Sequence, residues 1–392
     1  MIALVEKTKI AIIGTGFVAD MYVKTLPNHP HLGLVAVYDS DFERLKLHSS
    51  RWNVPAFEDI EKLLQKSGAE IILNLTNPRS HFAVTKQCLE SGRHVYSEKP
   101  LAMNAEKAAE LVSLAAERQL MLASAPCSML SEAAATIEKA LRDGLIGKVR
   151  LVYANFDDGL IAPKMTPWHW HNAAGIPWPA KDEFEVGCTY EHAGYLLTWL
   201  YRFFGPVREI TSFASCQIPD KGIPVEKMAP DFTVGCLKYD DNIVARLTCG
   251  LVAPRDKSLT IIGDDGIIYT PSVRSDVGPI YYQKIPSPGR WGGVERRLNR
   301  LRTGLESLLP VIPWSGHDWQ FRRKLPLVGT KPKILVGRGK PVDFLRGPAE
   351  MAQSIQQNRP CQLTAELGLH ITEIVEQLQN PKYEPVTLKT KT

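Results

Sequence analysis

The stretch EVGCTYEHAGYLLTWL (185–200) contains three polar residues whose spacing could place them in one site. Glu185, Thr189 and His192 lie four and then three residues apart, which puts them on one face of a continuous helix. A histidine with a pKa near neutrality, oriented by a carboxylate, can remove the proton of a hydroxyl group. The stretch is therefore either a catalytic helix or a buried helix with a few polar positions.

A glycine-rich turn near the start of the chain could bind a dinucleotide. The strand-like run 9–13 is followed at once by GTGFVAD, a GxGxxA motif with Gly14, Gly16 and Ala19. Gly14 permits the tight turn, Gly16 lets the backbone approach a pyrophosphate, and Ala19 lets the next helix pack closely on the strand. Asp39 ends a second predicted strand about 23 residues beyond Gly16, where an acid binds the adenosine ribose.

The choice of dinucleotide depends on Asp39 and the residues that follow it. A carboxylate at this position repels a 2′-phosphate and therefore favours NAD over NADP. Ser40 and Arg44 come shortly after it in the sequence and keep NADP open. The sequence predicts NAD, with NADP as the alternative.

Strand-like and helix-like segments alternate from residue 57 to residue 126. This alternation predicts a parallel, doubly wound Rossmann sheet. Ligands of such sheets bind beyond the carboxyl ends of the strands. Thr76, Asn77 and Lys99 fall at these ends and are expected to line the site.

The chain resembles the Gfo/Idh/MocA oxidoreductases, the family of glucose-fructose oxidoreductase and inositol dehydrogenase. The resemblance rests on GxGxxA, the acid that ends the second strand, TNPRSH (76–81) and SEKPLA (97–102), in this order. It covers the N-terminal domain fully and the C-terminal part more loosely. It implies that Lys99 lies at the nicotinamide and contacts the reacting hydroxyl, with a cis peptide before Pro100.

A lysine in that position can act in two ways. Partial removal from water lowers its pKa, and its ammonium group can donate a hydrogen bond to a developing alkoxide. Glu98 is expected to help position the cofactor, and His81 to cap the following helix rather than to catalyse. The expected cofactor-binding residues are Gly14, Thr15, Gly16, Phe17, Val18, Asp39, Ser40, Thr76, Asn77, His81, Glu98, Lys99 and Pro100.

The resemblance leaves two registers open for the catalytic base. The family carries D-x-G-x-H on a helix that faces the lysine, and alignment on the glycine puts Glu185 and Thr189 at the two functional positions. Alignment on the following tryptophan makes His192 the base. Because threonine cannot serve as that base, we expect His192 to be the acid–base residue and Lys99 the polarising group. Glu185 is expected to orient the base or to bind a substrate hydroxyl.

A second domain is expected beyond the linker-like segment 144–150. Short runs with a period of two, separated by YDDN (239–242) and GDDG (263–266), predict an open, mostly antiparallel sheet. The fold class is thus α/β with an α+β second domain: 1–128 for NAD(P) binding and 129–392 for substrate binding and oligomerisation. The resemblance implies a substrate on one face of this sheet and often a subunit interface on the other, hence a homo-oligomer, a dimer or a tetramer.

Several residues of the second domain are candidates for substrate binding. MTPWHWHNAAGIPWPAKDE (165–183) is dense in Trp and His, and Trp rings can stack on sugars, cover the adenine or simply fill the core. The two histidines have no third partner at metal-ligand spacing, so we expect no metal. PVDFLRGPAEM (341–351) resembles a late stretch of the family whose arginine either reaches substrate or supports the fold. The candidates are Trp168, Trp170, His171, Tyr195 and Arg346.

A basic insertion at about 273–340 departs from the family pattern. Residues 290–340 contain twelve Lys or Arg and only three acidic residues. Apolar residues recur at helical spacing from 294 to 308. Such a helix can pack on its own domain, bind substrate phosphates or lie weakly on an anionic membrane surface. The net charge of the whole chain is only +5, which gives no support for nucleic-acid binding.

The remaining signals concern compartment and function. Seven scattered cysteines and the lack of a membrane-length apolar run predict a reduced, cytoplasmic protein. We expect an NAD(P)-dependent oxidoreductase acting on a secondary hydroxyl or ketone of a sugar, cyclitol or nucleotide sugar. The alternatives are a catalytically inactive nucleotide-binding regulator or scaffold, and a reductase of the dihydrodiol or biliverdin type.

Overall fold

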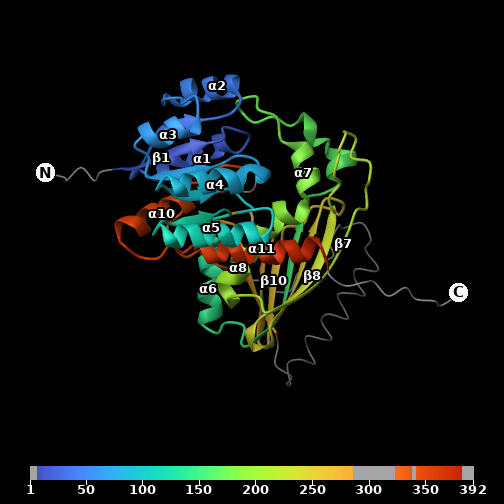
Figure 1. Cartoon of the computed structure of the whole chain (residues 1–392). Coiled ribbons are helices and arrows are strands. Elements are labelled where there is room, and N and C mark those ends of the chain that lie inside the picture. Colours follow the sequence, from blue (N-terminus) through green and yellow to red (C-terminus); the bar gives the residue numbers. More distant parts are fainter. Residues whose placement is uncertain (1–6, 286–322, 338–340, 382–392) are drawn as a thin grey trace, which may run out of the picture.

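The computed structural model describes residues 7–285, 323–337 and 341–381, and it contains two sheets (Figure 1). The first sheet is fully parallel with the strand order β2-β1-β3-β4-β5. Its central strand β3 is buried at every residue, as expected when helices cover both faces of a parallel sheet. The strands are β1 (Thr8–Ile13), β2 (Leu32–Tyr38), β3 (Ile71–Asn74), β4 (His94–Ser97) and β5 (Leu122–Ser124).

Five helices follow or separate these strands, and side-chain caps fix where three of them start. Asp41, Asp59 and Asn104 each accept a hydrogen bond from the backbone amide three residues on, which satisfies one free amide of the first turn. The prediction of a doubly wound Rossmann domain is therefore confirmed. The helices are α1 (Ala19–Thr25), α2 (Phe42–Trp52), α3 (Ile60–Lys66), α4 (His81–Glu90) and α5 (Ala105–Glu117).

The second sheet has eight described strands in the order β13-β12-β11-β10-β6-β9-β8-β7. Every neighbouring pair is antiparallel except β6 and β9, which confirms the mostly antiparallel sheet. The strands are β6 (Val149–Asp157), β7 (Glu209–Ser215), β8 (Phe232–Lys238), β9 (Val244–Gly250), β10 (Leu259–Gly263), β11 (Gly266–Thr270), β12 (Ile280–Lys284) and β13 (Arg323–Leu325).

Helix α8 (Cys188–Phe204) connects the second sheet with the rest of the molecule. It packs on β6 and β9 and contacts α11 (Ala365–Gln379), while its Trp199 is fully buried and donates a hydrogen bond to Ser128 at 3.1 Å. Figure 1 shows α11 crossing the middle of the molecule between the two sheets, and it contacts α5 and β7. The remaining helices are α6 (Glu132–Arg142), α7 (Ala180–Val186) and α10 (Arg346–Gln356).

The two C-terminal helices lie against the first sheet, although they come late in the sequence. Helix α10 contacts β3 and β4, and α11 contacts β5 and α5. The division of the chain at residue 128 stays a prediction. The predicted basic helix around 294–308 lies outside the described residues.

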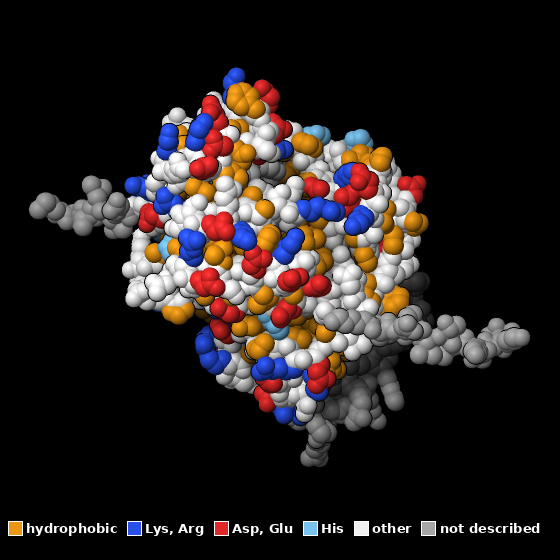
Figure 2. All heavy atoms as spheres, in the orientation of Figure 1, with side chains coloured by type: hydrophobic (Ala, Val, Ile, Leu, Met, Phe, Trp, Pro, Cys, Tyr) orange, Lys and Arg blue, Asp and Glu red, His pale blue; other side chains and the backbone are white. Residues whose placement is uncertain are grey.

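The surface gives two further facts. On the face shown in Figure 2, basic and acidic side chains are interspersed over α4 and α5. Among the described residues, no helix is long and apolar enough to cross a bilayer.

Candidate active site

A cavity of about 670 Å³ lies where the carboxyl ends of the parallel strands face α7 and α8. One part is lined by the glycine-rich turn and the ends of β2, β3 and β4. The other part is lined by α7, α8 and the loops that follow β6 and β11. Cofactor and substrate would therefore meet where Lys99, at the end of β4, faces α8.

The glycine-rich turn has room for a dinucleotide. Gly14 has φ +94°, and a Cβ there would lie 2.7 Å from backbone atoms of Leu75 and Thr76, so only glycine lets the turn pass the end of β3. A Cβ at Gly16 would meet no atom within 4 Å. The open space beside Gly16 lines the cavity together with Phe17 and Val18, and it fits the pyrophosphate of NAD(P).

Asp39 is surrounded by hydrogen-bond donors at the end of β2. Its carboxylate accepts from the Thr15 amide at 2.6 Å, the Thr15 hydroxyl at 2.9 Å and the Asp41 amide at 2.9 Å. Arg44 donates to both of its oxygens. Burial alone would raise the pKa of Asp39, but these donors outweigh it and lower the pKa. Ser40 also lines this part of the cavity, whereas Thr15 acts from behind Asp39.

The residues at the ends of β3 and β4 are tied together through His81. Its Nδ1 lies 2.6 Å from the Pro100 carbonyl oxygen and its Nε2 lies 3.0 Å from that of Thr76. The expectation that His81 caps α4 is wrong, because its ring lies between these two carbonyl oxygens and donates its one N–H to one of them. The Lys99–Pro100 peptide is cis, as the resemblance implies. Thr76, Asn77, His81, Glu98 and Lys99 line the cavity, whereas Pro100 does not.

Lys99 forms an ion pair with Glu191 of α8 across the cavity. Burial on its own would lower the pKa of Lys99, but the negative charge of Glu191 reverses this and raises the pKa. Glu98 holds the backbone from the other side, since it accepts hydrogen bonds from the Lys99 amide at 3.0 Å and the Tyr22 hydroxyl at 2.7 Å. Lys99 is therefore a fixed, protonated hydrogen-bond donor at neutral pH.

His192 follows Glu191 and faces the same cavity. Its Nε2 lies 3.3 Å from a carboxylate oxygen of Asp158 and 3.3 Å from one of Glu183. Its ring stacks on Phe156, with centroids 4.7 Å apart. Burial lowers the pKa of His192 to about 3, although the negative charge of Asp158 opposes this. The imidazole is therefore neutral at pH 7 and can accept a proton.

The two acids beside His192 have pKa values that are shifted in opposite directions. The pKa of Glu183 is raised well above its ordinary value, first by burial and then by the charge of Glu191. Burial also acts on Asp158, but the nearby positive groups, among them Lys257, lower its pKa. The two pKa shifts therefore have opposite signs, and Asp158 carries the negative charge beside Nε2.

The structure separates the three residues that the spacing placed on one helical face. Helix α7 ends at Val186, and Gly187, with φ +96°, breaks the chain before α8 begins. Glu185 points to Arg79, 3.2 Å away, and the Thr189 hydroxyl lies 2.7 Å from that of Thr233. Neither residue lines the cavity. The expectation of a shared face is wrong because it assumed one continuous helix.

The aromatic candidates divide in the same way. Trp170 and Trp178 line the cavity with ring centroids 5.5 Å apart, and Tyr195 lines it from α8. Trp168 packs on Gly222 and His171 is exposed, and neither lines the cavity.

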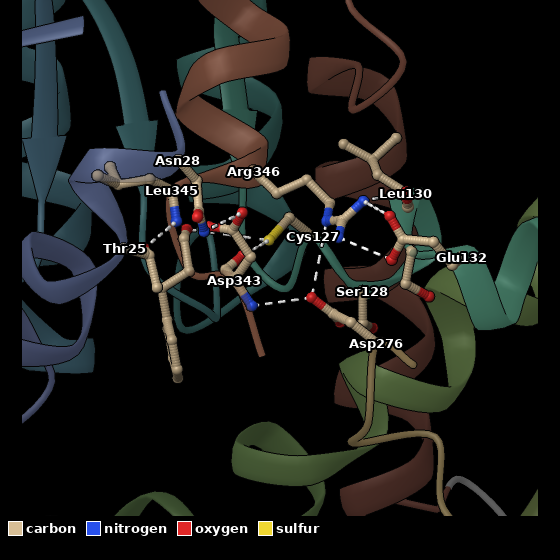
Figure 3. A network of polar contacts seen from close by, with 12 residues as sticks. Thr25, Asn28, Cys127, Ser128, Leu130, Glu132, Asp276, Asp343, Leu345 and Arg346 are labelled. Atoms are coloured by element: carbon tan, nitrogen blue, oxygen red, sulfur yellow. Dashed lines mark hydrogen bonds and ion pairs between the residues drawn. The ribbon is translucent and has the colours of Figure 1, made fainter. Parts of the chain in front are cut away.

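Arg346 also lies away from the cavity. It binds both carboxylate oxygens of Glu132 at 3.1 and 2.9 Å, and its Nε lies 3.6 Å from Asp276 (Figure 3). The assignment of Arg346 to substrate binding is therefore corrected, whereas a role in supporting the fold agrees with these contacts. Among the described residues, no group of three or more His, Cys, Asp or Glu side chains could hold a metal ion.

Comparison with known proteins identifies the family. Residues 8–125 match the oxidoreductase family with an NAD-binding Rossmann fold, and residues 134–269 match the GFO/IDH/MocA C-terminal domain. The human trans-1,2-dihydrobenzene-1,2-diol dehydrogenase is 30% identical over 266 residues, which cover 66% of this chain and 71% of that protein. The chain belongs to the Gfo/Idh/MocA family.

Two further comparisons support this assignment. An uncharacterized oxidoreductase of Synechocystis is 23% identical, and the match covers 66% of each chain, just under two thirds of that relative. The WlbA dehydrogenase of Bordetella pertussis, in complex with NADH and UDP-GlcNAcA, has the same fold, with a TM-score of 0.67, 16% identity and coverage of 98% and 99% of the two chains. The prediction of an NAD(P)-dependent oxidoreductase of this family is confirmed.

Sequence reasoning did not select several charged residues of this Gfo/Idh/MocA site. Asp158 had a usable signal, because FDDG (156–159) places two acids at the end of a strand. Glu191 directly precedes His192, but it occupies neither of the two positions that the family motif marks as functional. Glu183, Lys257 and Arg274 carry no motif, and only the folded chain brings them to the cavity.

Proposed function

We propose that this protein transfers a hydride between NAD(P) and a secondary hydroxyl or ketone of a sugar, cyclitol or nucleotide sugar. The observation that carries this proposal is the convergence of Lys99, Glu191 and His192 on one cavity next to the dinucleotide turn. The bound cofactor supplies the hydride acceptor or donor. The protein supplies the binding surface, the proton acceptor and the charge that stabilises the developing alkoxide.

Lys99 acts on the substrate oxygen. Its raised pKa keeps it protonated, so it donates a hydrogen bond and stabilises negative charge on that oxygen. Glu191 holds the ammonium group toward α8 and shares it with the incoming hydroxyl. Lysine and carboxylate thus form a fixed polar contact for the reacting C–O group.

His192 acts on the hydroxyl proton. Its Nδ1 is buried and has no hydrogen-bond partner among the described residues, whereas Nε2 lies beside Asp158 and Glu183. We assign the neutral imidazole as the proton acceptor, and the charge of Asp158 beside Nε2 stabilises the imidazolium that forms. In the reducing direction, the imidazolium returns the proton to the alkoxide.

The substrate class is supported by the aromatic wall of the cavity. Trp170 and Trp178 line it together with residues of α8, and apolar faces of sugar rings stack on such indoles. A structure of the same fold holds UDP-GlcNAcA, which adds nucleotide sugars to the class. A homo-oligomer and weak contact of the basic segment with a membrane surface remain part of the proposal.

A panel of free sugars, cyclitols and UDP-sugars tests this function. Each compound is mixed with protein and NAD or NADP, or with their reduced forms, and the absorbance of the reduced nicotinamide is followed. We expect turnover with at least one member, and a loss of kcat of about 10³-fold in Lys99→Ala and about 10²-fold or more in His192→Ala. Lys86→Ala, at an exposed lysine paired with Glu110, is the matched control and retains turnover.

One outcome would favour the inactive nucleotide-binding protein instead. If NADH binds, but no compound changes the absorbance of the nicotinamide in either direction, then the proposed oxidoreductase function is wrong. Turnover that persists in Lys99→Ala and His192→Ala would retain the enzyme and overturn the roles given to these two residues.

A further inference from the structure

Arg274 is a basic residue of the cavity that the mechanism above does not use. It lies in the loop between β11 and β12, and its guanidinium lies over the Tyr195 ring, 4.2 Å from the ring centroid. Both residues line the cavity. Stacking of this kind fixes the plane of the guanidinium and leaves its edge free to donate hydrogen bonds.

Arg274 differs from the other lysines and arginines of the cavity in having no carboxylate partner among the residues that the structure describes. Lys99 pairs with Glu191, Arg44 with Asp39, and both Lys257 and Arg255 with Asp158. Arg274 forms no ion pair with any residue in the described part of the chain. Its Nε is buried and has no hydrogen-bond partner there.

An unpaired, partly buried charge is unfavourable unless a ligand completes it. Removing a cation from water costs free energy, which an opposite charge at hydrogen-bonding distance offsets. The described carboxylates near Arg274 are engaged elsewhere, because Asp158 is occupied by Lys257 and Asp276 by Arg346. The arrangement is therefore complementary to an anion that enters the cavity.

The loop that carries Arg274 is held on both sides. The Val273 amide donates to the Lys257 carbonyl oxygen at 2.9 Å, and the Asp276 carbonyl oxygen accepts from the Ala133 amide at 2.9 Å. The Asp276 carboxylate accepts from the Asp343 amide at 2.8 Å and faces Arg346, as Figure 3 shows. Arg346 thus positions the loop from behind and does not itself reach the substrate.

Arg274 lies within electrostatic reach of the reacting groups. Burial raises the pKa of Tyr195, and the positive charges of Arg274 and Lys99 both oppose that rise. Tyr195 is therefore close to both side chains. An anion on Arg274 would be held near the substrate oxygen that contacts Lys99.

We propose that Arg274 binds a carboxylate of the substrate, so that this enzyme acts on sugars carrying a carboxylate near the reacting hydroxyl. The inference rests on the proposed function, because it assigns the substrate class of the same cavity. A carboxylate is the best match, since one guanidinium neutralises its single charge through two parallel hydrogen bonds. Neutral sugars of the same shape leave the guanidinium unpaired and bind less well.

Paired substrates test this assignment. Glucuronate is compared with glucose, and UDP-glucuronate with UDP-glucose, so that within each pair only the carboxylate differs. We expect kcat/KM to be at least about tenfold higher for the acid, which corresponds to about 1.4 kcal/mol. Arg274→Gln abolishes this preference, Arg274→Lys restores part of it, and Arg150→Gln, at an exposed arginine paired with Asp264, leaves the acid-to-neutral ratio unchanged.

The possible outcomes separate this inference from the proposed function. Turnover of neutral sugars that equals or exceeds that of the acids overturns the carboxylate assignment and retains the oxidoreductase. An equal loss of both activities in Arg274→Gln also overturns it. If no compound is turned over, the proposed function fails, and calorimetric titration of the protein–NADH complex decides the inference: glucuronate binding that requires Arg274 supports it, and binding unaffected by Arg274→Gln, or absent, overturns it.

Discussion

The guanidinium of Arg44 binds both carboxylate oxygens of Asp39, with Nε 3.0 Å from Oδ2 and Nη2 2.6 Å from Oδ1. Together with Thr15 and Asp41, five donors surround a carboxylate that has about four lone-pair positions. A ribose hydroxyl can therefore bind Asp39 only if it displaces one of them. The Arg44 side chain is partly exposed, unlike the buried Thr15, and once it turns away from Asp39 it can pair with a 2′-phosphate.

The first prediction concerns Arg44→Ala and the choice of dinucleotide. The Kd for NADP should rise about tenfold or more, because the group that offsets repulsion between Asp39 and a 2′-phosphate is lost. The Kd for NAD should stay unchanged or fall, because the ribose no longer competes with Arg44. Fluorescence titration with NADH and NADPH measures both constants. A parallel loss of both affinities would show that Arg44 supports only the local fold.

The second prediction compares two glutamates of the segment 185–200, Glu191 and Glu185. Glu191→Gln removes the carboxylate that does most to raise the pKa of Lys99, so that pKa falls and the ammonium group loses the partner that fixes it. We expect kcat to fall about 10- to 100-fold. Glu185→Gln is the matched control, because its partner Arg79 lies outside the cavity, and its kcat should stay within about threefold of the wild type. Steady-state kinetics with the same substrate measures both, and the reverse ranking would restore the register with Glu185 as the functional acid.

The third prediction concerns the other candidate of that register, Thr189. Its hydroxyl shares a buried hydrogen bond with Thr233, so Thr189→Val leaves one hydroxyl without its partner. This should lower the free energy of unfolding by about 1–3 kcal/mol and leave kcat within about threefold. Urea unfolding and steady-state kinetics separate the two effects. A loss of kcat comparable to that of His192→Ala, in a variant of normal stability, would place Thr189 in the reaction.

The sequence predicted the architecture well, because each sheet has a strong local pattern. Gly14 marks the dinucleotide turn and Asp39 marks the end of the second strand, and the alternation of strands and helices needs no knowledge of tertiary contacts. Helix α7 was the exception. The helical spacing of polar and apolar residues continues across Gly187 in the sequence. In the structure, the φ of +96° at Gly187 and the close approach of Gln379 and Ala229 end one helix and start another.

The charged residues that line the cavity from the second domain could not be predicted in the same way. Glu183, Lys257 and Arg274 come from a helix and two loops that are far apart in the sequence. Their roles depend on which of them pair, and pairing is decided by the fold. The same holds for Arg346, which looked like a substrate ligand but is occupied by Glu132 and Asp276.

The fourth prediction concerns Arg346→Met. This arginine neutralises two buried acids, and burial raises the pKa of Asp276 to about 7 even with Arg346 beside it. Loss of its charge leaves these acids uncompensated and should lower the free energy of unfolding by about 3–5 kcal/mol. Arg208→Met removes an exposed pair with Asp240, whose attraction is screened by water, and should lower the free energy of unfolding far less. Equal losses in the two variants, measured by urea unfolding, would contradict a buried network.

The last prediction concerns His192 and pH. Its folded-state pKa is about 3, against 6.5 for the ordinary group, so between these pH values the unfolded chain binds a proton that the folded chain does not. The free energy of unfolding therefore rises with pH across this window. It decreases by about 1.4 kcal/mol for each unit by which the pH falls. Between pH 6.5 and 5 the loss from this group is roughly 2 kcal/mol.

His192→Asn removes this group, so it should lose roughly 2 kcal/mol less than the wild type over the same interval. His171→Asn, at an exposed residue, should follow the wild type. Urea unfolding at the two pH values gives each difference, and matching slopes in the wild type and His192→Asn would show that His192 is not held neutral by burial. Because a neutral imidazole accepts the proton of the substrate, oxidation by the wild type should also retain its His192-dependent step at pH 5.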